Sequence, residues 1–244
     1  MNSKPSLSLR HVLCELPDAG RPGVESWSPF CMKAHRALRL AGVTYERRIG
    51  FPRAFAKYNP AAQVPVLLVD DRPIADSTEI LRHLITSGAE LEPKDPRDAA
   101  EAWLYEELGD TALNGFLVAS RWADPETWPA VSAAYFAEMP RPVRWIVPGR
   151  LRANVLQTLH ARDVLRRGLA AAKERWERIL DRLEARAPEQ GYWMGDALTV
   201  ADLGLFPQLF GATTGLTPEW GARVMARPRL WAWISRVQDA TRLS

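Results

Sequence analysis

The sequence predicts two domains, an α/β domain at residues 1–88 and an all-helical domain at residues 97–244. Short strand-like and helix-like patterns alternate in the first part, and only helical patterns follow it. The segment between them, 88–98, is charged and contains prolines, as linkers commonly do. A chain of 244 residues is long enough for two domains of ordinary size.

The first part predicts the order strand, helix, strand, short helix, strand, strand, helix. The predicted strands are 7–13, 43–49, 64–69 and 73–74. A helix with apolar residues at helical spacing begins at Phe30 and stops near Gly42, and a second contains residues 80–85. We expect a parallel strand pair with a crossover helix, then a hairpin turning at Asp70-Asp71 and a last helix.

The second part predicts helices at 99–121, 164–183, 200–210 and 228–240. The helix at 200–210 is apolar nearly all round, which is typical of the centre of a bundle. Five prolines interrupt residues 124–149, so we expect any helix there to be short.

The composition of the chain argues against several classes of protein. Two cysteines cannot form a disulfide framework, and the four scattered histidines suggest no metal site. The first residues have no signal-peptide core and no apolar run is long enough to span a membrane, so we expect a cytoplasmic protein. Residues 141–167 hold seven arginines and one acid, Asp163, which we interpret as a solvated helix face. Neither nucleic acid nor membrane is an expected partner.

Four short motifs follow one another along the chain. They are Ser28-Pro29-Phe30-Cys31, Gln63-Val64-Pro65, Asp76-Ser77 and Thr199-Val200-Ala201-Asp202. Their order and spacing resemble the glutathione transferase superfamily. The resemblance implies a thioredoxin-like N-terminal domain, a helical-bundle C-terminal domain, and glutathione as co-substrate without a metal. Thr199 and Asp202 have the spacing of a helix capping box, which is a structural role.

Ser28 stands where the first helix of the α/β domain should begin. Unpaired backbone N–H groups and the helix dipole favour a thiolate at such a position, and a serine hydroxyl can donate to it. Under the resemblance, Ser28 is the catalytic residue and activates the thiol of glutathione. A plain helix N-cap is the structural alternative.

The resemblance assigns the other motif residues to glutathione binding. Val64 precedes a proline, Pro65, that is cis in thioredoxin-like folds, and its backbone would pair with glutathione like an added strand. Asp76 and Ser77 would hold the γ-glutamyl amino and carboxylate groups, while Gln63 lies toward the glycine end. Asp76 replaces a more common Glu or Gln and has a shorter reach.

Three features depart from the family pattern. Residues 15–27 form a longer connection than usual, which is a lid, a partner-binding loop or a tolerated insertion. Cys31 occupies the second cysteine position of a glutaredoxin motif whose first cysteine is Ser28, so dithiol exchange is not expected and a buried, inert thiol is. The segment 139–167 matches no usual transferase helix, and the motifs are divided between tau-like and zeta-like patterns.

The leading hypothesis is a glutathione S-transferase that activates the thiolate for attack on a small hydrophobic electrophile, in detoxification. Candidate residues for the electrophile pocket are Trp103, Tyr105, Phe116 and Trp122. Alternatives are a glutathione-dependent isomerase and a non-catalytic, metaxin-like interaction module. The resemblance also implies a homodimer.

Overall fold

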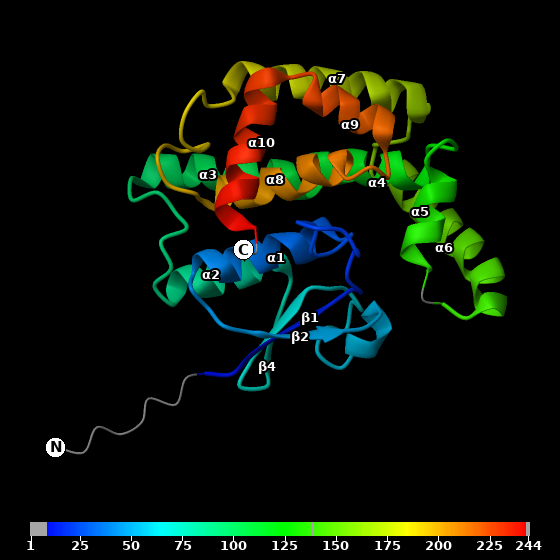
Figure 1. Ribbon diagram of the computed structural model, residues 1–244, viewed down its shortest axis with the longest axis horizontal. Coiled ribbons are helices and arrows are strands. Elements are labelled where there is room, and N and C mark those ends of the chain that lie inside the picture. Colours follow the sequence, from blue (N-terminus) through cyan, green and yellow to red (C-terminus); the bar gives the residue numbers. More distant parts are fainter. Residues whose placement is uncertain (1–8, 138, 243–244) are drawn as a thin grey trace. The chain divides into compact units, whose positions relative to one another are not determined.

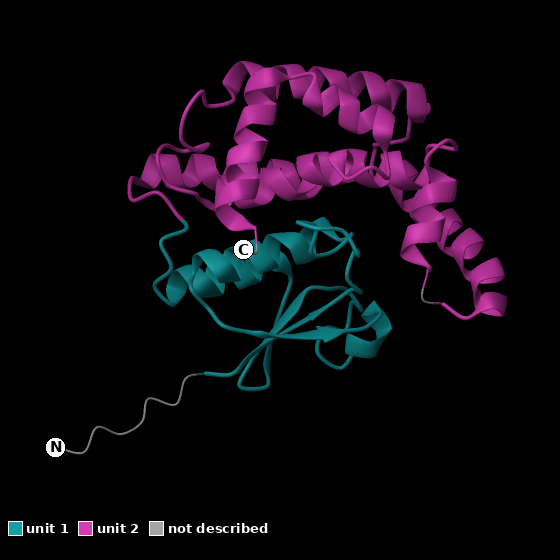
Figure 2. Cartoon of the chain, viewed as in Figure 1, with its two compact units in different colours: residues 1–91 teal, residues 92–244 magenta. Residues whose placement is uncertain are grey.

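A computed structural model describes residues 9–137 and 139–242 of the chain. The chain divides into two compact units, Met1–Leu91 and Glu92–Ser244 (Figure 2).

The first unit contains a four-stranded mixed sheet with helices, as the sequence predicts (Figure 1). Its elements are β1 (His11–Glu15), α1 (Pro29–Leu40), β2 (Glu46–Ile49), a 3-10 helix (Pro52–Phe55), β3 (Val66–Val69), β4 (Arg72–Ala75) and α2 (Ser77–Thr86). The strand order is β2-β1-β3-β4, with β1 parallel to β2 and the other pairs antiparallel. The predicted parallel pair, crossover helix and hairpin are confirmed.

Turn chemistry accounts for the element boundaries of this unit. The α1 helix ends with Gly42 in the left-handed region at φ +67°, and the Val43 N–H donates to the Leu38 carbonyl. That hydrogen bond keeps Val43 in the helix cap, so β2 begins three residues later than predicted. Asp70 and Asp71, at φ +47° and +64°, form the predicted hairpin turn. Of the predicted strand 7–13, residues 7 and 8 lie outside the described residues, and β1 continues to Glu15.

All the regular elements of the second unit within its described residues are helices. Its helices are α3 (Pro96–Leu108), a π-helical turn (Gly109–Leu113), α4 (Asn114–Trp122), α5 (Trp128–Tyr135), α6 (Arg141–Ala161), α7 (Gly168–Arg186), α8 (Val200–Thr213), α9 (Pro218–Met225) and α10 (Pro228–Thr241). The predicted helix 99–121 is therefore divided by the π-helical turn. The sequence patterns did not predict α9.

The central helix of the second unit is α8, which is buried along most of its length, as predicted. It approaches α3 so closely that a Cβ atom added to Gly204 would lie 2.5 Å from the Cα of Glu106. The predicted capping box is present at its start. Asp202 accepts the Thr199 N–H at 3.0 Å and the Trp233 indole N–H at 2.8 Å, which links α8 to α10.

The expectation of only short helices in residues 124–149 was wrong. Although α5 has eight residues, α6 begins at Arg141 and continues for 21 residues. Pro142 lies in the first turn, where a helix needs no N–H donor. Pro148 lies inside the helix and removes one hydrogen bond, but it is buried together with Leu159. This packing holds the helix through the break.

Candidate functional site

One end of the sheet, where β1 finishes, brings together three chain segments of the first unit. Cys14, near the end of β1, pairs with Val66 at the start of β3, and Val66 pairs with Ala75 at the end of β4. The Asp76 N–H also donates to the Pro65 carbonyl at 3.3 Å. The segment before β3 and the start of α2 therefore lie next to each other at this end of the sheet.

Ser28 is the N-cap of α1. Its backbone is extended at φ −80° and ψ 119°, and its Oγ accepts the Cys31 N–H at 3.3 Å. The Ser28 N–H in turn donates to the Oγ of the buried Ser26 at 3.2 Å. The structural role of an N-cap is thus present, and it leaves the hydroxyl proton of the half-buried Ser28 for another acceptor.

Val64 and Pro65 are joined by a cis peptide bond, as predicted. Among the residues that the structure describes, neither the N–H nor the C=O of Val64 has a hydrogen-bond partner. Gln63 has an exposed side chain, and its backbone carbonyl accepts a hydrogen bond from the Asn59 side chain at 3.0 Å. The backbone of Val64 is therefore open to pair with an added peptide.

Asp76 and Ser77 open the α2 helix. Asp76 is the N-cap, and its carboxylate accepts the Thr78 N–H at 2.8 Å. Its φ of +87° is unusual for a residue with a side chain and costs about 1–3 kcal/mol. Ser77 is buried and is the first residue of the helix, so its N–H has no acceptor within the helix.

The N-terminal parts of α1 and α2 are linked by a buried lysine that the sequence analysis did not place in the site. Lys33, in the second turn of α1, donates from Nζ to the Thr78 Oγ1 of α2 at 3.3 Å. Its charge adds to the positive ends of the two helix dipoles. The sequence does indicate this position, because a lysine that lies between apolar residues and close to the Ser28 motif is unusual.

Cys31 is a buried, free cysteine, as predicted. Burial raises the pKa of its thiol to about 12, although the Leu16 N–H and the hydroxyls of Ser28 and Ser26 favour the thiolate. A thiol with such a pKa is protonated at neutral pH and is a weak nucleophile. Cys31 is therefore not expected to act as a nucleophile.

The long connection at residues 15–27 is fastened to its own domain by buried charges. Glu25 accepts hydrogen bonds from Arg36 and Arg39 of α1. Glu15 is fully buried and contacts the His35 Nε2 at 2.7 Å, while His35 Nδ1 contacts the Tyr45 hydroxyl at 2.6 Å. This network explains why Arg36 of α1 is buried, which the amphipathic pattern of the helix did not predict.

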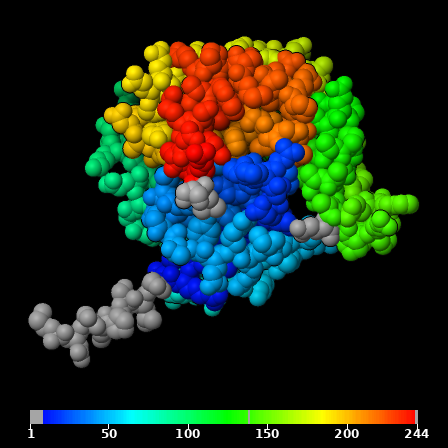
Figure 3. All heavy atoms as spheres, viewed as in Figure 1, coloured from blue at the N-terminus to red at the C-terminus, as the bar shows by residue number. Residues whose placement is uncertain are grey.

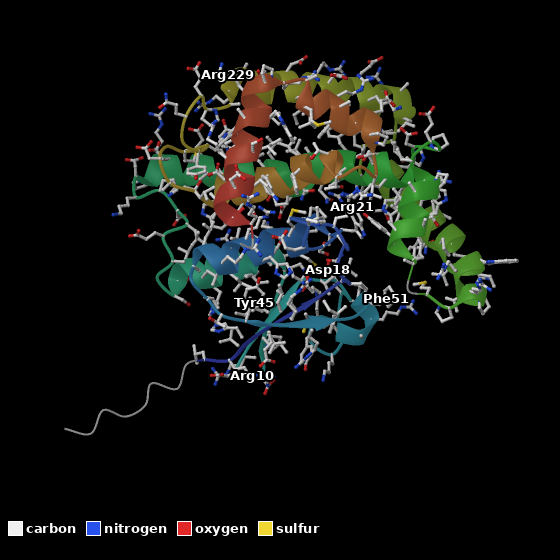
Figure 4. All side chains as sticks on the ribbon, viewed as in Figure 1. Arg10, Asp18, Arg21, Tyr45, Phe51 and Arg229 are labelled. Atoms are coloured by element: carbon white, nitrogen blue, oxygen red, sulfur yellow. The ribbon has the colours of Figure 1, made fainter. Side chains whose placement is uncertain are left out.

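A third acidic group of this connection is at its surface. Asp18, labelled in Figure 4, pairs with Arg47 of β2 at 2.9 Å. Arg47 also donates to Glu15 and to the Glu25 carbonyl. The connection is therefore part of the folded domain at both of its ends.

The aromatic residues expected at an electrophile pocket are core or half-buried residues of the second unit. Phe116 packs against Trp176, and Trp122 packs against Trp128. The Trp103 indole donates to Glu92, and Tyr105 packs edge-on against Trp193. Each of the four thus has a structural contact within its own unit.

The described residues contain no group of three or more His, Cys, Asp or Glu side chains arranged to hold a metal ion. Within residues 9–137 and 139–242, no helix combines the length and hydrophobicity needed to cross a membrane.

Comparison with known proteins finds one family in both halves of the chain. Residues 27–87 match the glutathione S-transferase N-terminal domain, and residues 162–236 match the C-terminal domain. Glutathione S-transferase U17 of Arabidopsis thaliana is 34% identical over 110 residues, which are 39% of this chain and 48% of the relative. Glutathione transferase GST 23 of Zea mays is 32% identical over 98 residues, 37% of this chain and 44% of the relative. The chain thus spans less than half the length of these curated relatives.

Solved structures share the fold over most of the chain. A glutathione S-transferase from Rhodospirillum rubrum has a TM-score of 0.63 at 19% identity, covering 93% of this chain and 87% of the other. Rice GST1, solved in complex with glutathione, has a TM-score of 0.62 at 21% identity, covering 97% and 91%. At these identities the likeness establishes a common fold.

Proposed function

The chain belongs to the glutathione S-transferase superfamily, and on this premise we propose that it binds glutathione and activates its thiol for attack on a small hydrophobic electrophile. The observation that carries the proposal is the end of the sheet in the first unit. There the unpaired backbone of Val64, just before β3, and the starts of α1 and α2, joined by the bond from Lys33 to Thr78, offer complementary groups for an anionic peptide.

The thiol would lie at the start of α1. Its thiolate is stabilised by the helix dipole and by a hydrogen bond from the Ser28 hydroxyl, whose oxygen already serves as the N-cap. Since Cys31 is buried and protonated, glutathione supplies the nucleophile. In this proposal, Ser28 is the catalytic residue.

The rest of the tripeptide would be held by backbone and helix-start groups. The Val64 N–H and C=O pair with the cysteinyl backbone, and the cis Pro65 follows them in the chain. The Ser77 N–H and hydroxyl hold the γ-glutamyl carboxylate, while Asp76 accepts the ammonium group. Gln63 lies toward the glycine carboxylate. The unusual φ of Asp76 supports this assignment, because such backbone is concentrated at ligand sites.

Calorimetric titration with glutathione at neutral pH tests the binding site. We expect saturable binding by the wild type and a loss of about 10- to 100-fold in affinity for Ser77→Ala, because hydrogen bonds to charged groups contribute about 1.5–3 kcal/mol. Ser77 is not the N-cap of α2, so the variant should keep its helix. Ser120→Ala, at a buried serine in α4, is the matched control and should bind like the wild type. Absence of binding by the wild type would contradict the proposal.

By the same resemblance we propose that the protein acts as a homodimer in the cytoplasm, in detoxification. One chain has a mass of 27.4 kDa. Sedimentation velocity would detect a dimer as about twice this mass, and a species of single-chain mass at micromolar concentration would contradict it.

A further inference from the structure

The first turns of α6 carry an unusual concentration of exposed apolar side chains. Trp145 is 88% exposed, Ile146 is 56% exposed and Val143 is 38% exposed. A large aromatic side chain in contact with water over most of its surface is uncommon, and clustered apolar exposure marks interaction sites. In Figure 3 residues of α6 lie in green on the surface of their unit.

The exposed residues of α6 lie either opposite the part of the helix that packs or in the turns that precede it. Pro148 and Leu159 are buried, and Arg152 on the same face donates to the Trp122 carbonyl at 2.7 Å. Val143, Ile146 and Arg150, at i, i+3 and i+7, share a face turned away from that contact. Trp145 and Arg141 project toward the packed side, but they lie in the first two turns of α6, where residues 141–146 are all exposed.

Positive charge accompanies the apolar residues. The α6 sequence, RPVRWIVPGRLRANVLQTLHA, has four arginines and no acid. Arg144 donates to the Met139 carbonyl and Arg152 to that of Trp122, so these two have structural roles. Arg141 and Arg150 are exposed, and neither makes an ion pair with a described residue. We call Arg141, Val143, Trp145, Ile146 and Arg150 the α6 surface.

We propose that the α6 surface docks the protein on an anionic lipid bilayer. A helix lying in a membrane interface places arginines among lipid phosphates and large apolar side chains at the acyl boundary, and tryptophan is favoured at that depth. An acidic protein partner would satisfy the arginines but would not by itself account for the exposed Trp145 and Ile146. The inference replaces the sequence-based interpretation of a solvated basic face, because side-chain exposure was not available to that interpretation.

The test is flotation of the full chain with phosphatidylcholine vesicles containing about 30% phosphatidylserine, or none. We expect binding to the anionic vesicles only, and release at high salt, because lipid attraction falls off within a Debye length. Two double variants remove one component each: Arg141→Gln with Arg150→Gln, and Trp145→Gln with Ile146→Gln. Each arginine contributes about fivefold to the affinity for anionic vesicles, so the first double variant should bind these vesicles about 25-fold more weakly.

Control variants make changes of the same kind elsewhere on the surface. Arg53→Gln with Arg182→Gln removes the same charge, and Met225→Gln replaces an apolar residue that is 45% exposed on α9. Both controls should bind vesicles like the wild type. Glutathione titration of every variant should be unchanged, which separates this proposal from the glutathione site.

Three outcomes would overturn the proposal. They are no flotation of the wild type with anionic vesicles at low salt, equal binding by the controls and the α6 variants, and undiminished binding by the Trp145 and Ile146 variant. The last would leave only charge attraction, as expected for an acidic protein partner.

Discussion

Replacing Ser28 by alanine removes the hydroxyl that we propose to stabilise the glutathione thiolate. In the structure its Oγ accepts the Cys31 N–H, so the hydroxyl proton remains to be donated. The adjacent Cys31 thiol, with its pKa raised by burial to about 12, is neutral and is a weak acceptor. A thiolate at the start of α1 is the stronger partner for this proton.

The expected size follows from the energy of one such hydrogen bond. A bond to a charged group contributes about 1.5–3 kcal/mol, and one pKa unit corresponds to about 1.36 kcal/mol. Ser28→Ala should therefore raise the pKa of bound glutathione by about 1–2 units. Below both pKa values conjugation should be about 10- to 100-fold slower, and well above them the two rates should converge, because the rate follows the thiolate fraction.

The assay is conjugation of 1-chloro-2,4-dinitrobenzene across a range from about pH 5.5 to 9. Ser28→Thr keeps both the N-cap and a hydroxyl donor and is the matched control. Losing the N-cap costs about 1 kcal/mol, so thermal unfolding of the alanine variant should be measured alongside. The reasoning is refuted if Ser28→Ala leaves the pH profile unmoved, or if the threonine variant shifts it equally. A wild type that binds glutathione without any turnover would instead favour the interaction-module hypothesis.

Three further predictions concern packing and titration. Gly204→Ala should destabilise the protein by about 1–3 kcal/mol in urea unfolding, since its Cβ would lie 2.5 Å from backbone of α3, whereas Gly149→Ala, with nothing within 4 Å, should be neutral or stabilising. Equal effects of the two substitutions would contradict the close approach of α3 and α8. Cys31 and Cys14 are buried and burial raises the pKa of both thiols, so iodoacetamide at about pH 8 should label neither until the chain is unfolded, and mass spectrometry would detect any exception. Burial alone would raise the pKa of Asp124, but hydrogen bonds from the Trp220 indole, Lys173 and the Glu126 N–H outweigh it and lower the pKa. Because the pKa is lower in the folded state, ionised Asp124 stabilises the fold above the unfolded value of about 3.9, and this stabilisation is lost as the pH falls through the folded pKa. Asp124→Asn should therefore be less stable than the wild type at pH 7, and its stability should approach that of the wild type below about pH 4 in urea unfolding. A constant difference between the two across that range would show that the charge of Asp124 has no such role.

Much of the fold follows from patterns of local interactions. The alternation of strands and helices in the first domain, the Asp70-Asp71 turn and the Thr199–Asp202 capping box each depend on residues close together in the chain. The same is true of Ser28 and Asp76, which lie at helix starts as their side chains favour. Their identity as site residues came from the order of motifs, and their role remains a prediction.

Tertiary structure decided what local patterns cannot encode. The long α6 helix persists through Pro148 because the residue is buried in its unit, and Arg36 of α1 is buried because Glu25 of a preceding segment pairs with it. Lys33 belongs to the candidate site because the fold brings α1 next to α2, which no local pattern in the sequence indicates. The sequence by itself determined which residues favour strands, turns and helix starts, whereas which charges are buried and which apolar residues stay exposed depends on contacts between distant segments, because burial is a property of the packed chain.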